Sequence, residues 1–339
     1  MVKSVILFTH GEVRILRKKE ILLSLLKAGN GAYISGEELA QRLSLSRASV
    51  WKAVSALRKD GYEIDAATNK GYRLSPQNDV LSTQGVRNYL SPALQGMAIE
   101  VLPVASSTNT ILRQRALGAA RSESVLIAAS QTEGRGRRGR SFFSPADTGV
   151  YMSLLLQPEH YTAGQAEKLT AMAALAACEA IEAVSQKSAA IKWVNDIYIA
   201  GKKVCGILTE ASFDLESGLV DSIVLGIGFN AYLPREGFPP GIAHTAGAIF
   251  EAAQPDGKNR LAAAFLNHFW DAYSQGTPSD FAARYRRRNL AIGREVQVLS
   301  PMGAKTAFAL DVDDDCHLLV RYQDGSTAQL ASGEISLQL

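Results

Sequence analysis

Gly134-Arg135-Gly136-Arg137-Arg138-Gly139-Arg140-Ser141 is the stretch that decides the fold of the central part of this chain. It matches the GxGxxG pattern of dinucleotide-binding folds, and it resembles a phosphate-binding P-loop in which Arg140 replaces the lysine. Both folds need a strand before the loop and a helix after it, so that phosphate lies at the helix N-terminus. An apolar strand is predicted over 125–129, but residues 142–149 contain proline and glycine and show no helical period. The sequence therefore excludes both motifs.

What remains is a loop with four arginines between positions 135 and 140, whose glycines let the backbone approach a ligand closely. Adjacent positive charges repel one another, so we expect the unliganded loop to be mobile and to become ordered on an anion. Guanidinium groups bind carboxylates and phosphates through paired hydrogen bonds. The alternative is a solvated or nucleic-acid-binding basic run. The flanking strands place the loop inside a folded domain, which favours a small anionic ligand.

Lys192 is a second cation predicted in a β-rich part of the chain, within the apolar segment 190–199. A buried lysine is costly unless it is paired, so an anionic partner from the protein or a ligand is expected. A long amphipathic helix is predicted over 165–186, and further strands over 150–156, 204–210 and 222–230. Within the last strand, Gly226 and Gly228 indicate that a ligand or another backbone packs close to it.

An arginine loop, a buried lysine and the neighbouring Asn195 and Asp196 together favour activation of a carboxylate. In that chemistry the carboxylate attacks the α-phosphorus of ATP, and cations hold both anions and the charge that develops between them. No Ser-His-Asp or Cys-His arrangement in the sequence competes with this interpretation.

The first 80 residues form a basic module, because 13 of the 36 Lys and Arg but only 8 of the 33 Asp and Glu lie there. The spacing of apolar residues predicts helices over 14–27 and 36–43, and a third helix that begins at the N-cap Ser46 and ends at Lys59. Two alternating strands over 61–65 and 69–74 would then form a wing. Two functions fit this pattern: DNA binding, or a module that only packs within the protein and exposes a basic face.

A helix, a short turn and a helix with basic and hydroxyl residues at its front are typical of helix-turn-helix proteins, whose second helix enters the major groove. The candidate DNA-contacting residues lie at the start of the third helix and in the wing: Ser46, Arg47, Ser49, Lys52 and Lys70.

The composition limits the class of protein. Hydrophobic residues make up 47% and charged residues 20%, which is ordinary for a globular chain and excludes a disordered or fibrous one. No apolar run reaches the length of a membrane helix. The three cysteines are far apart, which predicts buried thiols in the cytoplasm rather than disulfides. The histidines form no metal-binding pair, so no built-in metal site is expected.

The chain resembles the biotin–protein ligases, and in particular the bifunctional type that also represses the biotin synthesis operon. Four segments carry the resemblance in the family's order: Ser107-Thr108-Asn109, Gln131 with the glycine–arginine loop, Lys192-Trp193-Val194-Asn195-Asp196 and Gly226-Ile227-Gly228-Phe229-Asn230. The resemblance runs from about residue 15 to Leu339, and the arginine loop is its most specific part.

The resemblance implies an α+β protein with three domains. A winged helix-turn-helix would cover residues 1–76, of which 1–14 carry no helical or capping signal and are expected to be disordered or to precede the true start. A catalytic domain related to class II aminoacyl-tRNA synthetases, with a mixed sheet, would cover 77–289. An SH3-like β-barrel would cover 290–339, where short alternating strands and polar turns agree with it.

The resemblance also implies a site in which Lys192, Arg135 and Arg137 are catalytic. The residues implied for biotin are Ser107, Thr108, Asn109, Gln131, Arg135, Gly136, Arg137 and Lys192, and those for the nucleotide are Arg137, Phe142, Lys192, Asn195, Asp196 and Asn230. Two positions depart from the family, which often has proline at Val194 and tryptophan at Phe142. Valine fits the predicted strand, so its effect should be mild, whereas phenylalanine offers less area for stacking on adenine.

The implied substrates are biotin and ATP, with Mg²⁺ arriving on ATP. The implied partners are a biotin carboxyl carrier protein, operator DNA and a second copy of the chain in a ligand-induced homodimer, with no membrane. A lipoate–protein ligase is an alternative enzyme, against which the winged helix and the arginine loop argue. A regulator that binds biotin or its adenylate without ligating it is the other alternative, against which Lys192 and the loop argue.

Overall fold

The computed structural model describes residues 10–75, 77–118, 123–158, 161–214, 216, 218–276, 278–300 and 303–337. The chain forms two compact units, one of Met1–Val80 with Ala253–Asp256 and the other of Leu81–Ala252 with Gly257–Leu339. The first unit ends close to the predicted boundary after residue 76. Residues 290–339, predicted as a separate barrel, pack together with the catalytic part in the second unit.

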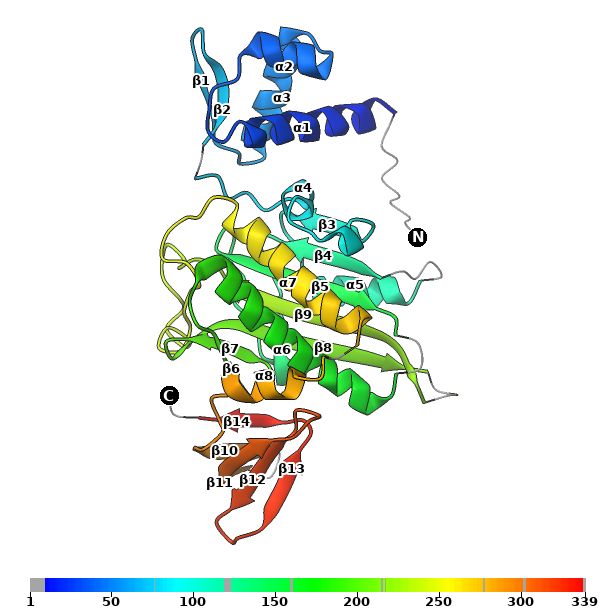
Figure 1. Cartoon of the computed structure of the whole chain (residues 1–339), viewed down its shortest axis with the longest axis vertical. Coiled ribbons are helices and arrows are strands. Elements are labelled where there is room, and N and C mark those ends of the chain that lie inside the picture. Colours follow the sequence, from blue (N-terminus) through cyan, green and yellow to red (C-terminus); the bar gives the residue numbers. More distant parts are fainter. Residues whose placement is uncertain are drawn as a thin grey trace. The chain divides into compact units, whose positions relative to one another are not determined.

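The first unit is a winged helix-turn-helix (Figure 1). Ser35 and Ser46 begin the second and third helices by accepting a backbone N–H of the first turn, as expected for N-caps. The helix that was predicted to begin at residue 14 begins at His10, and residues 1–9 of the predicted tail lie outside the described residues. The elements are α1 (His10–Ala28), α2 (Gly36–Leu43), α3 (Arg47–Lys59), β1 (Ile64–Ala67) and β2 (Gly71–Leu74).

A seven-stranded mixed sheet forms the centre of the second unit, in the order β3-β4-β5-β9-β8-β7-β6. β3 and β4 pair in parallel, and the other neighbouring strands in this order pair antiparallel. The glycine–arginine loop leads from β4 into its antiparallel neighbour β5 and holds only the short 3₁₀ turn η2 (Arg137–Gly139). The exclusion of dinucleotide and P-loop motifs is therefore confirmed. The strands are β3 (Ala98–Leu102), β4 (Ser124–Ala128), β5 (Gly149–Leu156), β6 (Ala190–Lys192), β7 (Asp196–Ile199), β8 (Lys202–Phe213) and β9 (Val220–Asn230).

Helices cover both faces of this sheet (Figure 1). Every residue of β5 is buried, and successive side chains of a strand point to opposite faces. Met152 and Leu154 share a core with α6 (Ala163–Ser185) and α7 (Gly257–Ser274), whereas Leu155 packs with Leu112 of α5 (Thr108–Ala116). The face that carries α5 is the face on which the pocket described below is built. Two short elements, α4 (Thr83–Arg87) and η1 (Pro92–Leu94), precede β3.

A five-stranded antiparallel sheet follows α8 (Phe281–Arg288), with the order β13-β12-β11-β10-β14. It is anchored to the edge of the large sheet, because the backbone N–H of Leu290 donates to the carbonyl of Ile191 at 2.8 Å. The predicted α+β class, with a mixed central sheet and an SH3-like C-terminal sheet, is confirmed. Its strands are β10 (Glu295–Ser300), β11 (Gly303–Val312), β12 (Leu318–Tyr322), β13 (Thr327–Leu330) and β14 (Glu334–Ser336). In the described residues no helix is long and apolar enough to cross a membrane.

Candidate functional site

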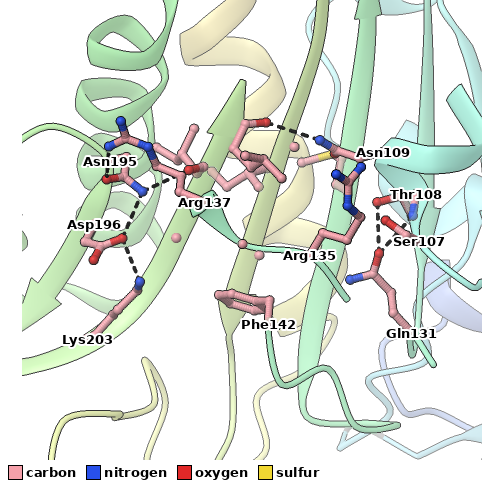
Figure 2. A pocket seen from close by; sticks show the side chains of 18 residues that line it. Ser107, Thr108, Asn109, Gln131, Arg135, Arg137, Phe142, Asn195, Asp196 and Lys203 are labelled. Atoms are coloured by element: carbon pink, nitrogen blue, oxygen red, sulfur yellow. Dashed lines mark hydrogen bonds and ion pairs between the residues drawn. The ribbon is translucent and has the colours of Figure 1, made fainter. Parts of the chain in front are cut away.

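A pocket that is open to solvent lies where α5 and the glycine–arginine loop meet strands β8 and β9 (Figure 2). It brings together most of the predicted site residues, namely Ser107, Thr108, Asn109, Gln131, Arg135, Gly136, Arg137, Phe142, Asn195 and Asp196.

One end of the pocket is polar and neutral, and its side chains hold one another in place. Ser107 is the N-cap of α5, and the backbone N–H of Thr108 donates to Gln131 Oε1 at 2.9 Å. Gln131 Nε2 donates in turn to the hydroxyl of Ser144 at 3.1 Å. Asn109 is 5% exposed and donates to Glu210 Oε2 at 2.9 Å. This end is preorganised to recognise a neutral polar group.

The other end is cationic. Arg137 Nη1 donates to Asn195 Oδ1 at 3.0 Å, and burial lowers the pKa of the Arg137 guanidinium, although the group stays charged. Asn195 Nδ2 donates to Asp196 Oδ1 at 3.1 Å, and Lys203 Nζ lies 2.6 Å from the same oxygen. Asn195 and Lys203 therefore contact the same carboxylate, and Arg137 adds a second positive charge beside them, which leaves excess positive charge for an anionic ligand.

Three glycines of the sheet make room for the side chains that shape this pocket. A Cβ at Gly226 would lie 2.0 Å from Asn109 Oδ1, and one at Gly228 would lie 2.5 Å from the ring of Phe142. A Cβ at Gly206, which is paired with Gly228, would lie 3.1 Å from the same ring. Side chains of the site, rather than another backbone, thus pack on Gly226 and Gly228, and both glycines also line the pocket in which a ligand is expected.

Lys192 and Asn230 are the two predicted residues that do not line the pocket. Asn230 ends β9, where its amide donates to the carbonyl of Gly247 at 3.1 Å. Lys192 lies directly opposite Asp196 in the β6–β7 pair, so it borders the cationic end. Burial lowers the pKa of Lys192 against the opposing effect of Asp196. Across the described ranges its ammonium group has no hydrogen bond or ion pair.

Lys203 is a pocket residue that sequence reasoning missed. The sequence predicts a strand that begins at residue 204, but Lys202 and Lys203 already belong to β8. Strand alternation gave no signal for Lys203, because the β7–β8 pairing is irregular at this point, with Ile197 opposite Cys205 and Tyr198 opposite Lys203. Val194, in contrast, was assigned to a strand and lies in the turn between β6 and β7.

The four arginines of the loop all have partners in the protein. Arg135 lies 3.1 Å from Glu210, and Arg138 and Arg140 lie 3.5 Å and 2.7 Å from Glu334 of β14. Carboxylates far along the chain therefore offset part of the repulsion on which the expected mobility of the loop rests, and the mobility itself stays a prediction. Only the fold could reveal these ion pairs, since these residues are 75 or more positions from the loop.

The candidate DNA-binding residues lie on the outside of the first unit. The hydroxyl of Ser46 accepts the backbone N–H of Ser49 at 3.2 Å, so both residues shape the start of α3. The Arg47 side chain is 78% exposed, and Lys52 and Lys70 are exposed as well. Trp51 is 58% exposed on the same side of α3 and was missed, although its spacing of four residues from Arg47 indicated an outward position.

Three family descriptions match successive parts of the chain. The HTH domain family matches residues 17–73, the biotin/lipoate A/B protein ligase family matches residues 101–230, and the biotin protein ligase C-terminal domain family matches residues 291–338. Fold and pocket together therefore define an acyl-activating ligase fused to a DNA-binding module.

Relatives along nearly the whole chain narrow this class. The bifunctional ligase/repressor BirA of Bacillus spizizenii is 32% identical over 322 residues, covering 93% of this chain and 97% of that protein. BirA of Escherichia coli is 30% identical over 323 residues, covering 94% and 96%. A mutant biotin protein ligase from Aquifex aeolicus, solved in complex with biotin, has a TM-score of 0.58 and 26% identity, covering 71% of this chain and 98% of that one. The chain belongs to the family of bifunctional biotin–protein ligase/repressors.

Proposed function

We propose that this protein attaches biotin to a biotin carboxyl carrier protein and represses the biotin synthesis operon. In the first step the biotin carboxylate attacks the α-phosphorus of ATP, giving biotinyl-5′-AMP and releasing pyrophosphate. In the second step the amine of an acceptor lysine attacks the acyl carbon, forming an amide and releasing AMP and a proton. The observation that carries this proposal is the single pocket with a neutral polar end and a cationic end.

The neutral end fits the uncharged ring system of biotin. Ser107, Thr108, Asn109 and Gln131 offer hydroxyl, amide and backbone groups that can donate to and accept from a ureido group. Their mutual hydrogen bonds hold them in place before the ligand arrives, which lowers the entropy cost of binding. Arg135 and Gly136 lie between the two ends and would cover the tail of biotin.

The cationic end fits the carboxylate and the nucleotide phosphates. Arg137 and Lys203 line it. Lys192 borders it with a partly buried ammonium group that makes no hydrogen bond or ion pair with the described residues, which supports a role in holding the attacked phosphate. Asn195 and Asp196 would lie beside the nucleotide, and the ring of Phe142 offers a face for stacking on adenine. A place for Asn230 near the nucleotide rests on the family resemblance alone.

Mg²⁺ would enter bound to ATP, where it would neutralise part of the triphosphate charge. Asp196 is the carboxylate of the pocket that could reach it, but it is already paired with Lys203. Among the described residues no group of three or more His, Cys, Asp or Glu side chains is arranged to hold a metal ion.

Replacing Arg137 by alanine is expected to release biotinyl-5′-AMP faster. The adenylate is a reactive mixed anhydride, and a closed site keeps water and stray amines away from it. Because Arg137 joins the loop to Asn195 across the pocket, its loss opens that closure. Dissociation of adenylate should be measured by rapid dilution, together with unspecific labelling of lysines.

Arg140→Ala is the matched control, because Arg140 belongs to the same loop and carries the same charge but is 67% exposed and paired with Glu334 outside the pocket. An unchanged dissociation rate in Arg137→Ala would show that the loop does not retain the intermediate.

Incubation with labelled biotin, ATP and an isolated acceptor domain tests the ligase directly. Labelled acceptor is expected with biotin, and lipoate should not replace it. Transfer of lipoate in place of biotin would favour the lipoate-ligase alternative, and tight biotin binding without any transfer would favour the regulator that lacks ligase activity.

For repression, α3 would enter the major groove of the operator and the β1–β2 wing would lie along the backbone. Arg47, Lys52 and Lys70 are exposed cations suited to phosphate oxygens, and Ser46 and Ser49 carry hydroxyls at the front of α3. The exposed ring of Trp51 would add an apolar contact of the kind that thymine methyl groups accept.

We also propose that biotinyl-5′-AMP promotes a homodimer in the cytoplasm, since one winged helix offers few DNA contacts and a symmetric dimer offers twice as many. By linkage, operator DNA should in turn strengthen dimerisation. The three cysteines are buried and unpaired, which fits a reducing compartment. Sedimentation with and without the adenylate tests the dimer, and an identical monomer–dimer equilibrium in both would contradict it.

A further inference from the structure

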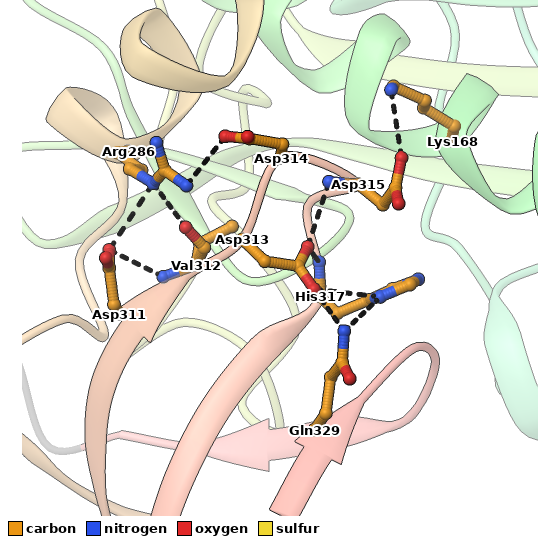
Figure 3. Close-up of polar contacts among 9 residues, drawn as sticks. All are labelled: Lys168, Arg286, Asp311, Val312, Asp313, Asp314, Asp315, His317 and Gln329. Atoms are coloured by element: carbon orange, nitrogen blue, oxygen red, sulfur yellow. Dashed lines mark hydrogen bonds and ion pairs between the residues drawn. The ribbon is translucent and has the colours of Figure 1, made fainter.

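The turn between β11 and β12, Asp313-Asp314-Asp315-Cys316, is here called the aspartate turn (Figure 3). Its first carboxylate organises it from within. Asp313 Oδ1 accepts the backbone N–H groups of Asp315 and His317, each at 2.9 Å. Asp313 Oδ2 lies 3.1 Å from His317 Nδ1 and also accepts a hydrogen bond from the Gln329 side chain. One carboxylate therefore takes part in four polar contacts, which leaves the turn little freedom.

The aspartate turn is also tied to two helices of the catalytic part (Figure 3). Arg286 of α8 donates to the carbonyl of Val312 and pairs with Asp314 at 2.9 Å. Lys168 of α6 pairs with Asp315 at 3.2 Å. Asp314 and Asp315 are largely exposed, so these two ion pairs restrict where the turn lies but add little to the stability of the fold.

The aspartate turn holds Trp193, a buried side chain in the segment that also carries Lys192 and Asn195. Cys316 has a φ of +66°, and its carbonyl accepts the indole N–H of Trp193 at 3.0 Å. Trp193 is 2% exposed, and Gly333 lies beside its ring. A buried indole N–H without an acceptor costs the full desolvation of the group, so this hydrogen bond fixes where the ring lies.

Trp193 directly follows the last residue of β6 and begins the turn that carries Asn195. Lys192 precedes it directly, and Lys192 and Asp196 face each other across the hairpin. The hydrogen bond to Cys316 holds the ring of Trp193 in place. The ring therefore also holds the short backbone segment that carries Lys192 and Asn195. Displacements of about 1 Å in such groups can cost about 10²-fold in rate.

We propose that the aspartate turn is a positioning element for adenylate formation, acting through Trp193 on Lys192 and Asn195. This inference rests on the role proposed above for Lys192. Trp193→Phe removes the donor and keeps an aromatic ring in the core. We expect its single-turnover rate of adenylate formation to fall by about 10- to 100-fold. The Kd for biotin, measured in the absence of ATP, should stay within about twofold, because the neutral end of the pocket is untouched.

Substitutions in the turn itself separate positioning from general damage. Asp313→Ala should reproduce the loss of rate, and Asp313→Asn should recover part of it, because its amide oxygen can still accept a backbone N–H. Lys187→Ala is the control, since it removes an exposed ion pair with Glu251 that does not involve the turn, and it should leave the rate unchanged. Loss of biotin affinity in parallel with rate in Trp193→Phe and Asp313→Ala would overturn the inference.

A double-mutant cycle with Lys192→Ala completes the experiment. If the turn acts by placing Lys192, Trp193→Phe should cost little further rate once Lys192 is gone, since the two changes disable one unit. Fully additive losses would overturn the inference while leaving the role of Lys192 intact. An unimpaired Lys192→Ala enzyme would instead overturn the proposed role of Lys192, and with it the inference.

Discussion

Lys192→Ala is expected to lower the rate of biotinyl-5′-AMP formation by about 10²–10³-fold, with a much smaller effect on biotin binding. Negative charge builds up on the attacked phosphate as pyrophosphate leaves, so a nearby ammonium group stabilises the transition state more than the ground state. Lys192 is suited to this because it is partly buried, borders the cationic end and makes no hydrogen bond or ion pair with the described residues. Single-turnover adenylation with saturating ATP, beside biotin binding measured separately, would check it.

Lys202→Ala is the matched control for this experiment. It removes the same charge close by in the chain, but Lys202 is exposed and donates to the carbonyl of His244 outside the pocket. Its adenylation rate should match that of the unmodified protein. Normal single-turnover adenylation by Lys192→Ala would show that Lys203 or Arg137 suffices and would remove Lys192 from the mechanism.

Operator affinity is expected to fall by about 10³-fold between 50 and 200 mM salt when the adenylate is bound. A dimer that presents Arg47, Lys52 and Lys70 twice would neutralise six phosphates, which corresponds to a slope of about −5 in a plot of log affinity against log salt concentration. Arg47→Ala removes one contact from each half-site, so the slope should become about −3.6. Fluorescence anisotropy with labelled operator over a salt series would measure both values.

The control for the salt series is Lys305→Ala, which removes an exposed lysine from β11 in the second unit and should leave the slope unchanged. A slope near zero for the unmodified protein would contradict a phosphate-binding role for the wing and α3. Equal affinity with and without adenylate would contradict the coupling between biotin supply and repression.

Local patterns in the sequence were sufficient to predict the helices and strands and most residues of the site. Ser46 at an N-cap, the proline and glycine after the arginine loop and the apolar strands each act over a few residues, and each appears in the structure at the expected place. Most residues named for the site from the family's motifs line one pocket. The motifs sufficed because their residues lie at strand ends and helix caps, where neighbours in sequence stay neighbours in space.

Only the tertiary structure determines which positive charges are not balanced by carboxylates of the protein and so remain available to a ligand. Glu210 and Glu334 lie far from the arginine loop in sequence, yet they compensate three of its four arginines. The strand pairing that brings Lys203 against Asp196 is likewise invisible in the linear order of residues. The physical reason is that local propensity acts over a few residues, whereas pairing and desolvation of charges depend on which distant strands become neighbours when the chain folds.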